Sequence, residues 1–284
     1  MRFTDWFHLQ KILKTKDGND IELWSFDYDI LDATVMSEWA RLFRNNYCLD
    51  SYLDMYRSGR NLSRKEFLIQ NVFPDKTNYF GPATRSGDFS EILIADFLEY
   101  IENYWIPSRI RYENKPTKNS STPGSDVVAI KFVDDSLANP QDELLVVETK
   151  GKYTGKNAKK QLFEIIGLPE RELENRLQDA VDDSNKDPTR LGEFLNFAKV
   201  RFVNCGKIEE SKKIERFQDE FGKPYNKKFG AAAFFDKVVY DDAFVLKTDC
   251  SEHSCKQKMR LLVVTGNDMM KLIHHLYEKA ADEA

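Results

Sequence analysis

Two short β-branched runs constrain the fold of this chain more than any other feature. The first covers residues 126–133 (DVVAIKFV), the second covers residues 144–150 (LLVVETK), and the residues between them are turn-forming. Runs of this length and composition predict two strands that pair as a hairpin. The continuous apolar stretch Leu144–Val147 further predicts that the second strand is buried on both faces of a sheet.

Helical segments flank this hairpin, so the chain is expected to mix α and β structure. A capping-box-like start at Asp88 and Glu91 predicts a long helix that runs to about Tyr104. Further helices are expected at residues 37–44, 157–182, 189–203 and 268–279, and a further strand at residues 260–265. The turn-rich residues 78–87 divide the chain into an N-terminal α+β extension, residues 1–80, and a larger unit, residues 81–284.

Composition excludes several classes of protein. With 31% charged residues and no apolar run of about 18 residues, the chain is not an integral membrane protein. Its N-terminus has no secretory signal pattern, so a cytoplasmic location is expected, and its four irregularly spaced cysteines are expected to be free thiols. The net charge of -5 means that nucleic-acid binding would have to come from a local basic patch or from a partner.

Acidic and basic side chains gather at the ends of the two predicted strands. Glu148 and Lys150 are two residues apart and therefore share one face of a strand, while Asp126 begins the preceding strand and can lie opposite them. Two carboxylates placed in this way can share a divalent metal, and oxygen ligands favour Mg²⁺ or Mn²⁺ over zinc. None of the four histidines is close in sequence.

Glu91 borders the apolar stripe of its predicted helix. That position suits a carboxylate that faces a cleft, and it equally suits a residue that only caps the helix. Spacing alone also leaves two interpretations of Asp126, Glu148 and Lys150. They either form a chemical site or belong to a surface hairpin with one exposed Glu and Lys pair.

A basic segment next to the second strand favours the chemical interpretation. It contains five lysines in eleven residues, namely Lys150, Lys152, Lys156, Lys159 and Lys160, and no acid occurs from residue 149 to residue 163. Tyr153 lies within it and either stacks on a nucleotide or packs in the core. Carboxylates that hold a metal, a neighbouring lysine and flanking basic residues form a coherent apparatus for phosphodiester hydrolysis.

These residues resemble the motifs of the PD-(D/E)XK nuclease superfamily. Glu91 corresponds to the acid that the family carries on a helix, and Asp126 corresponds to the acid that begins the first strand. Glu148-Thr149-Lys150 corresponds to the (D/E)-x-K motif. Gln161 is similar to a glutamine that many members carry near the site. Ser125 stands where the family has proline, and Thr149 is a polar choice for the middle position, but neither difference removes a ligand.

The resemblance implies a restriction-endonuclease-like α/β core, in which a mixed sheet is flanked by helices. It implies that Asp126 and Glu148 bind Mg²⁺ or Mn²⁺, that Glu91 supports the metal or its water, and that Lys150 assists the nucleophile. The basic residues Lys152, Lys156, Lys159 and Lys160 would then contact the nucleic acid.

The wider sequence frame is similar to the HamA-like nuclease subunit of the Hachiman anti-phage defence system. This similarity implies DNA as the substrate and a superfamily 2 helicase (HamB-like) as the partner. A non-catalytic subunit that binds DNA or a helicase, and an RNA-cutting nuclease, remain as alternatives. Cys250, His253 and Cys255 could supply three zinc ligands, but a second Cys/His pair is missing, so a loop with chance cysteines is the favoured interpretation.

Overall fold

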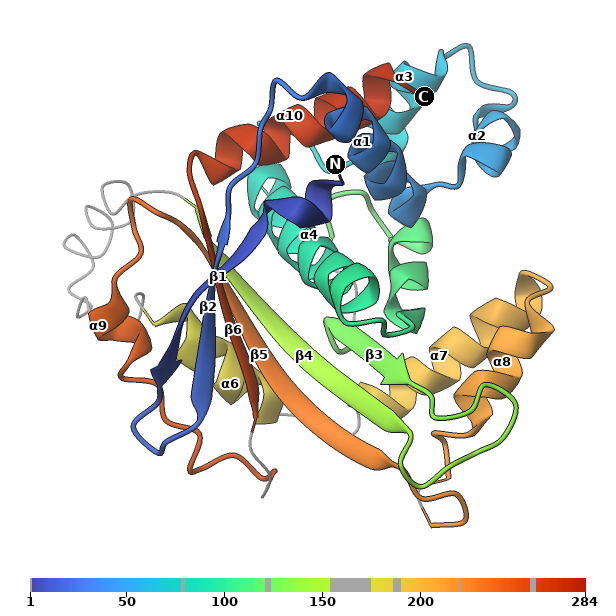
Figure 1. Cartoon of the computed structure of the whole chain (residues 1–284). Coiled ribbons are helices and arrows are strands. Elements are labelled where there is room, and N and C mark those ends of the chain that lie inside the picture. The colour runs from blue at the N-terminus through green and yellow to red at the C-terminus, as the bar shows by residue number, and fades with distance from the viewer. Residues whose placement is uncertain are drawn as a thin grey trace.

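A six-stranded mixed sheet is the framework of the chain in the computed structural model (Figure 1). The structure describes residues 2–77, 80–120, 124–153, 175–185, 190–219, 221–255 and 259–284. The strands are β1 (Phe7–Lys14), β2 (Asp20–Phe26), β3 (Val127–Lys131), β4 (Glu143–Lys152), β5 (Asn226–Asp236) and β6 (Arg260–Gly266). Their order is β1-β2-β6-β5-β4-β3, with antiparallel pairs at both edges and parallel pairs between them. The expected α/β class with a mixed sheet is confirmed.

The hairpin expected from the two β-branched runs is β3 and β4. They pair antiparallel from Val127 opposite Val147 to Lys131 opposite Glu143. On its other side β4 pairs in parallel with β5, so the Leu144–Val147 stretch is interior to the sheet and buried. Alternate side chains of a strand point to opposite faces, and β4 follows this rule: Leu145 and Val147 pack on one side, Leu144 and Val146 on the other.

Helices cover both faces of the sheet, as the apolar side chains on both faces of its inner strands require. They are α1 (Ala33–Tyr47), α2 (Asp50–Arg57), α3 (Arg64–Phe67), α4 (Gly81–Asp96), α6 (Arg176–Asn185), α7 (Arg190–Asn204), α8 (Ile208–Glu215), α9 (Asp242–Val245) and α10 (Met269–Asp282). Figure 1 shows α1, α4 and α10 on one side of the sheet and α6 on the other, and the buried side chains form corresponding clusters. A third cluster joins α7 and α8 to the opposite side of the β3–β4 hairpin from α4.

The N-terminal segment is joined to the same sheet. Within residues 1–80, strand β2 pairs in parallel with β6, and β1 completes that edge. Helix α1 packs its apolar side against α10 at the other end of the chain, where Phe43 and Tyr277 meet edge to face with ring centroids 4.8 Å apart. None of the helices in the described parts of the chain is long and apolar enough to span a bilayer.

The helix that carries Glu91 begins earlier than the sequence indicates. Helix α4 starts at Gly81 and has a proline in its first turn, a position that proline favours because its fixed φ suits the helix and its missing N–H is not needed there. Asp88 is therefore inside the helix and buried, so the expectation that it caps the helix is wrong. A π-helical turn, Phe97–Ile101, prolongs α4, and Pro107 begins a 3₁₀ helix that ends at Asn114.

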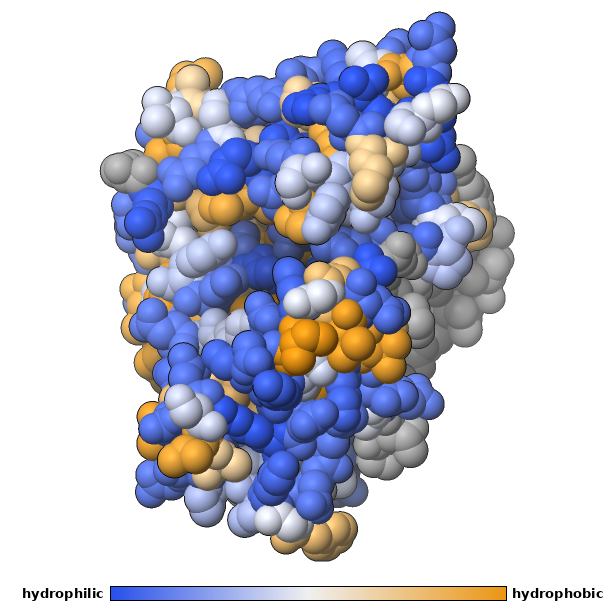
Figure 2. All heavy atoms as spheres, turned by 90° about the vertical axis from the view of Figure 1, so that its right-hand side faces the viewer, coloured by the Kyte–Doolittle hydropathy of each residue, from blue (hydrophilic) through white to orange (hydrophobic). Residues whose placement is uncertain are grey.

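An apolar stripe on α7 is open to solvent. Phe197, Val200 and Val203, spaced three residues apart, are 45%, 53% and 47% exposed. Figure 2 shows an apolar patch near the middle of the side of the molecule where α7 and α8 lie in Figure 1, next to hydrophilic residues. Contiguous exposed apolar surface of this kind is typical of a contact surface for another protein.

Candidate active site

Asp126 and Glu148 meet at the open end of the β3–β4 hairpin. Pairing ends at Val127 and Val147, so the next residues on both strands stand side by side. The Asp126 carboxylate accepts hydrogen bonds from the Thr149 backbone N–H (2.9 Å) and from Thr149 Oγ1 (3.2 Å). The position of Asp126 opposite residues 148–150 is as the sequence predicts, because the two strands pair antiparallel with Val127 opposite Val147.

Glu148 is a buried acid with a shifted pKa. Burial raises the pKa of its carboxyl to about 8, and the neighbouring Asp126 charge adds to this effect. Arg190, at the first turn of α7, acts in the opposite direction: its Nη1 lies 3.2 Å from Glu148 Oε1. Two acidic groups that share a small buried site hold a proton tightly, and a cation placed between them would relieve their repulsion.

Lys150 is held by an acid from a different helix. By strand alternation it faces the same side as Glu148, toward α6 and α7. Its Nζ lies 2.6 Å from Asp183 Oδ2 on α6. Burial lowers the pKa of this lysine, but the hydrogen bond to Asp183 and the charges of Asp126 and Glu148 outweigh burial, so the pKa is raised and Lys150 carries its charge.

A cleft opens beside these residues on the α6 and α7 side of the hairpin. Its walls include Ser125, Glu148, Asp183, Ser184, Arg190 and Lys227. Arg190 and Asp183 are not among the candidate site residues that the sequence predicts. No local pattern signals either contact, because both helices are distant from β4 in sequence.

Glu91 approaches the hairpin end from α4, on the other side of the sheet. Its Oε2 accepts a hydrogen bond from the Tyr112 hydroxyl (2.6 Å) and lies 3.5 Å from Arg111 Nη1. Burial raises the pKa of Glu91 to about 8, and the charges of Asp126 and Asp88 add to this while Arg111 lowers it. The capping-only interpretation is wrong, because Glu91 lies well inside α4.

The carboxylates form a pair rather than a three-ligand cluster. In the described ranges no group of three or more His, Cys, Asp or Glu side chains is placed to hold a metal ion. Mg²⁺ commonly keeps several waters and binds through one or two carboxylates together with phosphate oxygens of the substrate. The donor set of Asp126 and Glu148, which offers oxygen atoms only, therefore fits Mg²⁺ or Mn²⁺.

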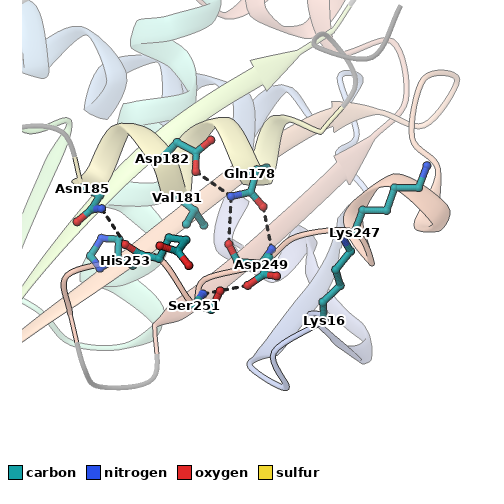
Figure 3. Close-up of a pocket in the computed structure, with 10 residues that line it drawn as sticks. Lys16, Gln178, Val181, Asp182, Asn185, Lys247, Asp249, Ser251 and His253 are labelled. Atoms are coloured by element: carbon teal, nitrogen blue, oxygen red, sulfur yellow. Dashed lines mark hydrogen bonds between the residues drawn. The ribbon is translucent and has the colours of Figure 1, made fainter.

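The Cys250, His253 and Cys255 loop packs on α6 as ordinary structure. Figure 3 shows Gln178 facing Asp249 in this loop. The side-chain amide of Gln178 donates to the Asp249 carbonyl (3.1 Å) and accepts from the Asp249 backbone N–H (2.8 Å). Both ring nitrogens of His253 are engaged, one by the Cys255 backbone N–H and one by Ser184 Oγ, each at 3.0 Å. Burial raises the pKa of the Cys250 thiol to about 12, so it stays protonated. These contacts support the interpretation of a loop with chance cysteines.

The structure describes some of the residues that the sequence predicts to contact nucleic acid. Lys152 is on β4, near its end. Tyr153 is buried, with its hydroxyl 2.6 Å from Ser90 Oγ, so it packs in the core and is not free to stack on a nucleotide. The remaining expected positions, Lys156, Lys159, Lys160 and Gln161, lie outside the described residues.

Comparison with known proteins gives one match that covers nearly the whole chain. A family model described as HamA matches residues 1–280. No curated protein matches the chain, and no solved structure matches it.

Proposed function

Because the chain belongs to the HamA family and is thus a component of the Hachiman anti-phage defence system, we propose that it is a metal-dependent nuclease that cuts DNA. The observation that carries this proposal is the Asp126 and Glu148 pair at the end of a buried hairpin, with Lys150 two residues further along β4. We further propose that α4, β3, β4 and β5 form a core of the PD-(D/E)XK type.

Each group in the site has a defined task in this proposal. Asp126, fixed by the Thr149 N–H, and Glu148 would hold the metal, and Glu91 would support its water shell from the α4 side. A bound Mg²⁺ supplies charge for the phosphoryl oxygens and lowers the pKa of its water. Lys150, held in place by Asp183, would orient the attacking water or stabilise the charge that develops on phosphate.

A helicase partner also belongs to this proposal. The net charge of -5 gives the chain no overall attraction for DNA, so delivery by another subunit is physically reasonable. The exposed stripe on α7 provides apolar surface that such a subunit would cover.

The proposal is tested by incubating supercoiled plasmid with the purified chain and Mg²⁺. We expect nicked or linear product from the wild type, and none from Glu148→Gln, from Asp126→Asn, or after chelation. Glu209→Gln, an exposed position on α8, is the matched control and should cut like the wild type. Parallel reactions with single-stranded RNA distinguish the proposed DNA-cutting activity from the RNA-cutting alternative.

If the purified chain does not cut, it either has no nuclease activity or needs its partner for that activity. The reaction is therefore repeated with the helicase subunit and ATP. No cleavage in either reaction, with the circular dichroism of a folded protein, would favour the non-catalytic alternative. Cleavage that survives Glu148→Gln and Asp126→Asn would place the activity elsewhere in the chain.

A further inference from the structure

A further cavity is lined by Tyr112, the residue whose hydroxyl donates to Glu91. It encloses about 360 Å³, within the range of roughly 300–1,000 Å³ that is usual for small-ligand sites. Its walls come from α1, α2, the α3 region and the 3₁₀ helix Pro107–Asn114. No part of the chemistry described above uses it.

Aromatic rings form much of this cavity. Tyr47, Phe67 and Tyr112 are buried at its base, and the rings of Tyr47 and Tyr112 lie 5.6 Å apart. Tyr56, 41% exposed, stands at its rim. Aromatic faces bind nucleobases by stacking whatever the base, since every base has a π-face.

Cations outnumber acids in the lining. The lining cations are Arg60, Lys115 and Lys118, and the lining acid is Glu113. Lys115 is paired with Asp88, Lys118 with Asp75, and Glu113 with Arg201 at 2.8 Å, so the positive charge offered to a ligand comes from Arg60. Within the described part of the chain Arg60 makes no ion pair. Its guanidinium lies 5.4 Å from the centre of the Phe67 ring and donates to the Tyr56 carbonyl at 2.8 Å. An exposed guanidinium beside an aromatic wall suits a phosphate attached to a stacked base.

The cavity and the candidate active site share a wall. The Tyr112 hydroxyl donates to Glu91, while Lys115 Nζ bonds to Asp88 Oδ1 (2.6 Å), one turn before Glu91 on α4. A nucleotide seated here would be separated from the Asp126 and Glu148 end of the hairpin by the Tyr112 and Glu91 layer.

We propose that this cavity binds a nucleoside phosphate, with the base against Tyr56 and the phosphate near Arg60. One source of such a ligand is a single strand of nucleic acid, of which the cavity would hold one nucleotide. The inference rests on the proposed nuclease function for the source of that strand. The same chemistry would take a free nucleotide, and the experiment separates the two sources.

The test is equilibrium binding to the full chain without divalent metal, so that cleavage plays no part. The probes are a fluorescent single-stranded oligothymidylate and, as competitor, thymidine 5′-monophosphate. Arg60→Ala and Tyr56→Ala should each weaken oligonucleotide binding about tenfold, the loss expected for one stacking or phosphate contact. Matched controls are Arg41→Ala, an exposed arginine on α1, and Phe221→Ala, a fully exposed aromatic residue that does not line this cavity, and both should bind like the wild type.

The outcomes are distinct. Binding of the oligonucleotide that the mononucleotide does not displace identifies a strand site, and displacement that depends on Arg60 identifies a free-nucleotide site. Binding that neither Arg60→Ala nor Tyr56→Ala weakens, or no binding of either probe, overturns the inference. If the chain cuts plasmid but fails this binding test, the nuclease proposal stands and the nucleotide site is rejected. If binding depends on Arg60 but the chain cuts nothing, the nucleotide site stands and the nuclease proposal is rejected.

Discussion

Arg190 Nη1 on α7 lies 3.2 Å from Glu148 Oε1 on β4, so the end of the β3–β4 hairpin is joined to a helix residue 42 positions further along the chain. The same arginine donates to the Gly124 carbonyl, just before Asp126. One guanidinium thus contacts Glu148 on β4 and the segment that leads into β3, at the point where the carboxylates meet.

This contact predicts that Arg190 competes with a divalent ion. Arg190→Gln should lower the Mn²⁺ concentration for half-saturation about tenfold, because a positive charge near the carboxylates repels the metal. Arg190→Lys keeps the charge and should stay near the wild-type value. Mn²⁺ binding is followed by electron paramagnetic resonance, and weaker binding by Arg190→Gln would show that Arg190 supports the metal site instead.

The buried carboxyl of Glu148 predicts a pH dependence of stability. Its pKa, about 8, is above the ordinary value of 4.5, so the folded state holds the proton more tightly than the unfolded state. The stability from this proton is fully present below the unfolded pKa and is lost as pH rises through about 8. Without metal, the free energy of unfolding should therefore fall between about pH 5 and pH 8, by on the order of 1–4 kcal/mol.

Urea denaturation at a series of pH values, in the presence of a chelator, measures this fall. Glu148→Gln has no proton to lose at this position and should show a smaller fall than the wild type. Glu209→Gln serves as the control and should follow the wild type. Equal slopes for the wild type and Glu148→Gln would contradict the shifted pKa.

The Lys115 and Asp88 pair beneath Glu91 is predicted to be essential for stability. Both side chains are 4% exposed, and Tyr47 also donates to Asp88. Lys115→Met leaves a buried carboxylate without its cation and should cost about 3–5 kcal/mol. Lys76→Met removes an ion pair with Glu278 in which both side chains are about half exposed, and should cost less than about 1 kcal/mol. Similar urea midpoints for the two variants would contradict this prediction.

Two glycines are predicted to respond oppositely to alanine. At Gly151, next to Lys150, a Cβ would lie 2.7 Å from the Tyr153 ring and 2.9 Å from Ser90 Oγ, so Gly151→Ala should destabilise by about 1–3 kcal/mol. Gly87 is inside α4 with no atom within 4 Å of a new Cβ, so Gly87→Ala should stabilise by about 0.5–1 kcal/mol. Thermal unfolding of both variants decides the signs.

The start of α4 and the identity of β5 show where local sequence misleads. Asp88 matches a capping pattern, yet its carboxylate is used inside the fold by Lys115, and the helix begins at Gly81. Strand β5 includes Gly230 and three consecutive alanines, residues with low strand preference, and the sequence does not predict it. These small residues form a strand because β4 and β6 pair with them on both sides and α6 packs over them.

The sequence by itself determined the local arrangement at the hairpin. Strand alternation sets Glu148 and Lys150 on one face, and the antiparallel pairing of the two β-branched runs sets Asp126 opposite them. Only the tertiary structure decided their partners: Arg190, Asp183 and the Tyr112 hydroxyl on Glu91 come from three other helices. The physical reason is that side chains alternate between the two faces of a strand, so their direction follows from the local sequence. Contacts between a strand and helices far away in the sequence depend instead on how the whole core packs.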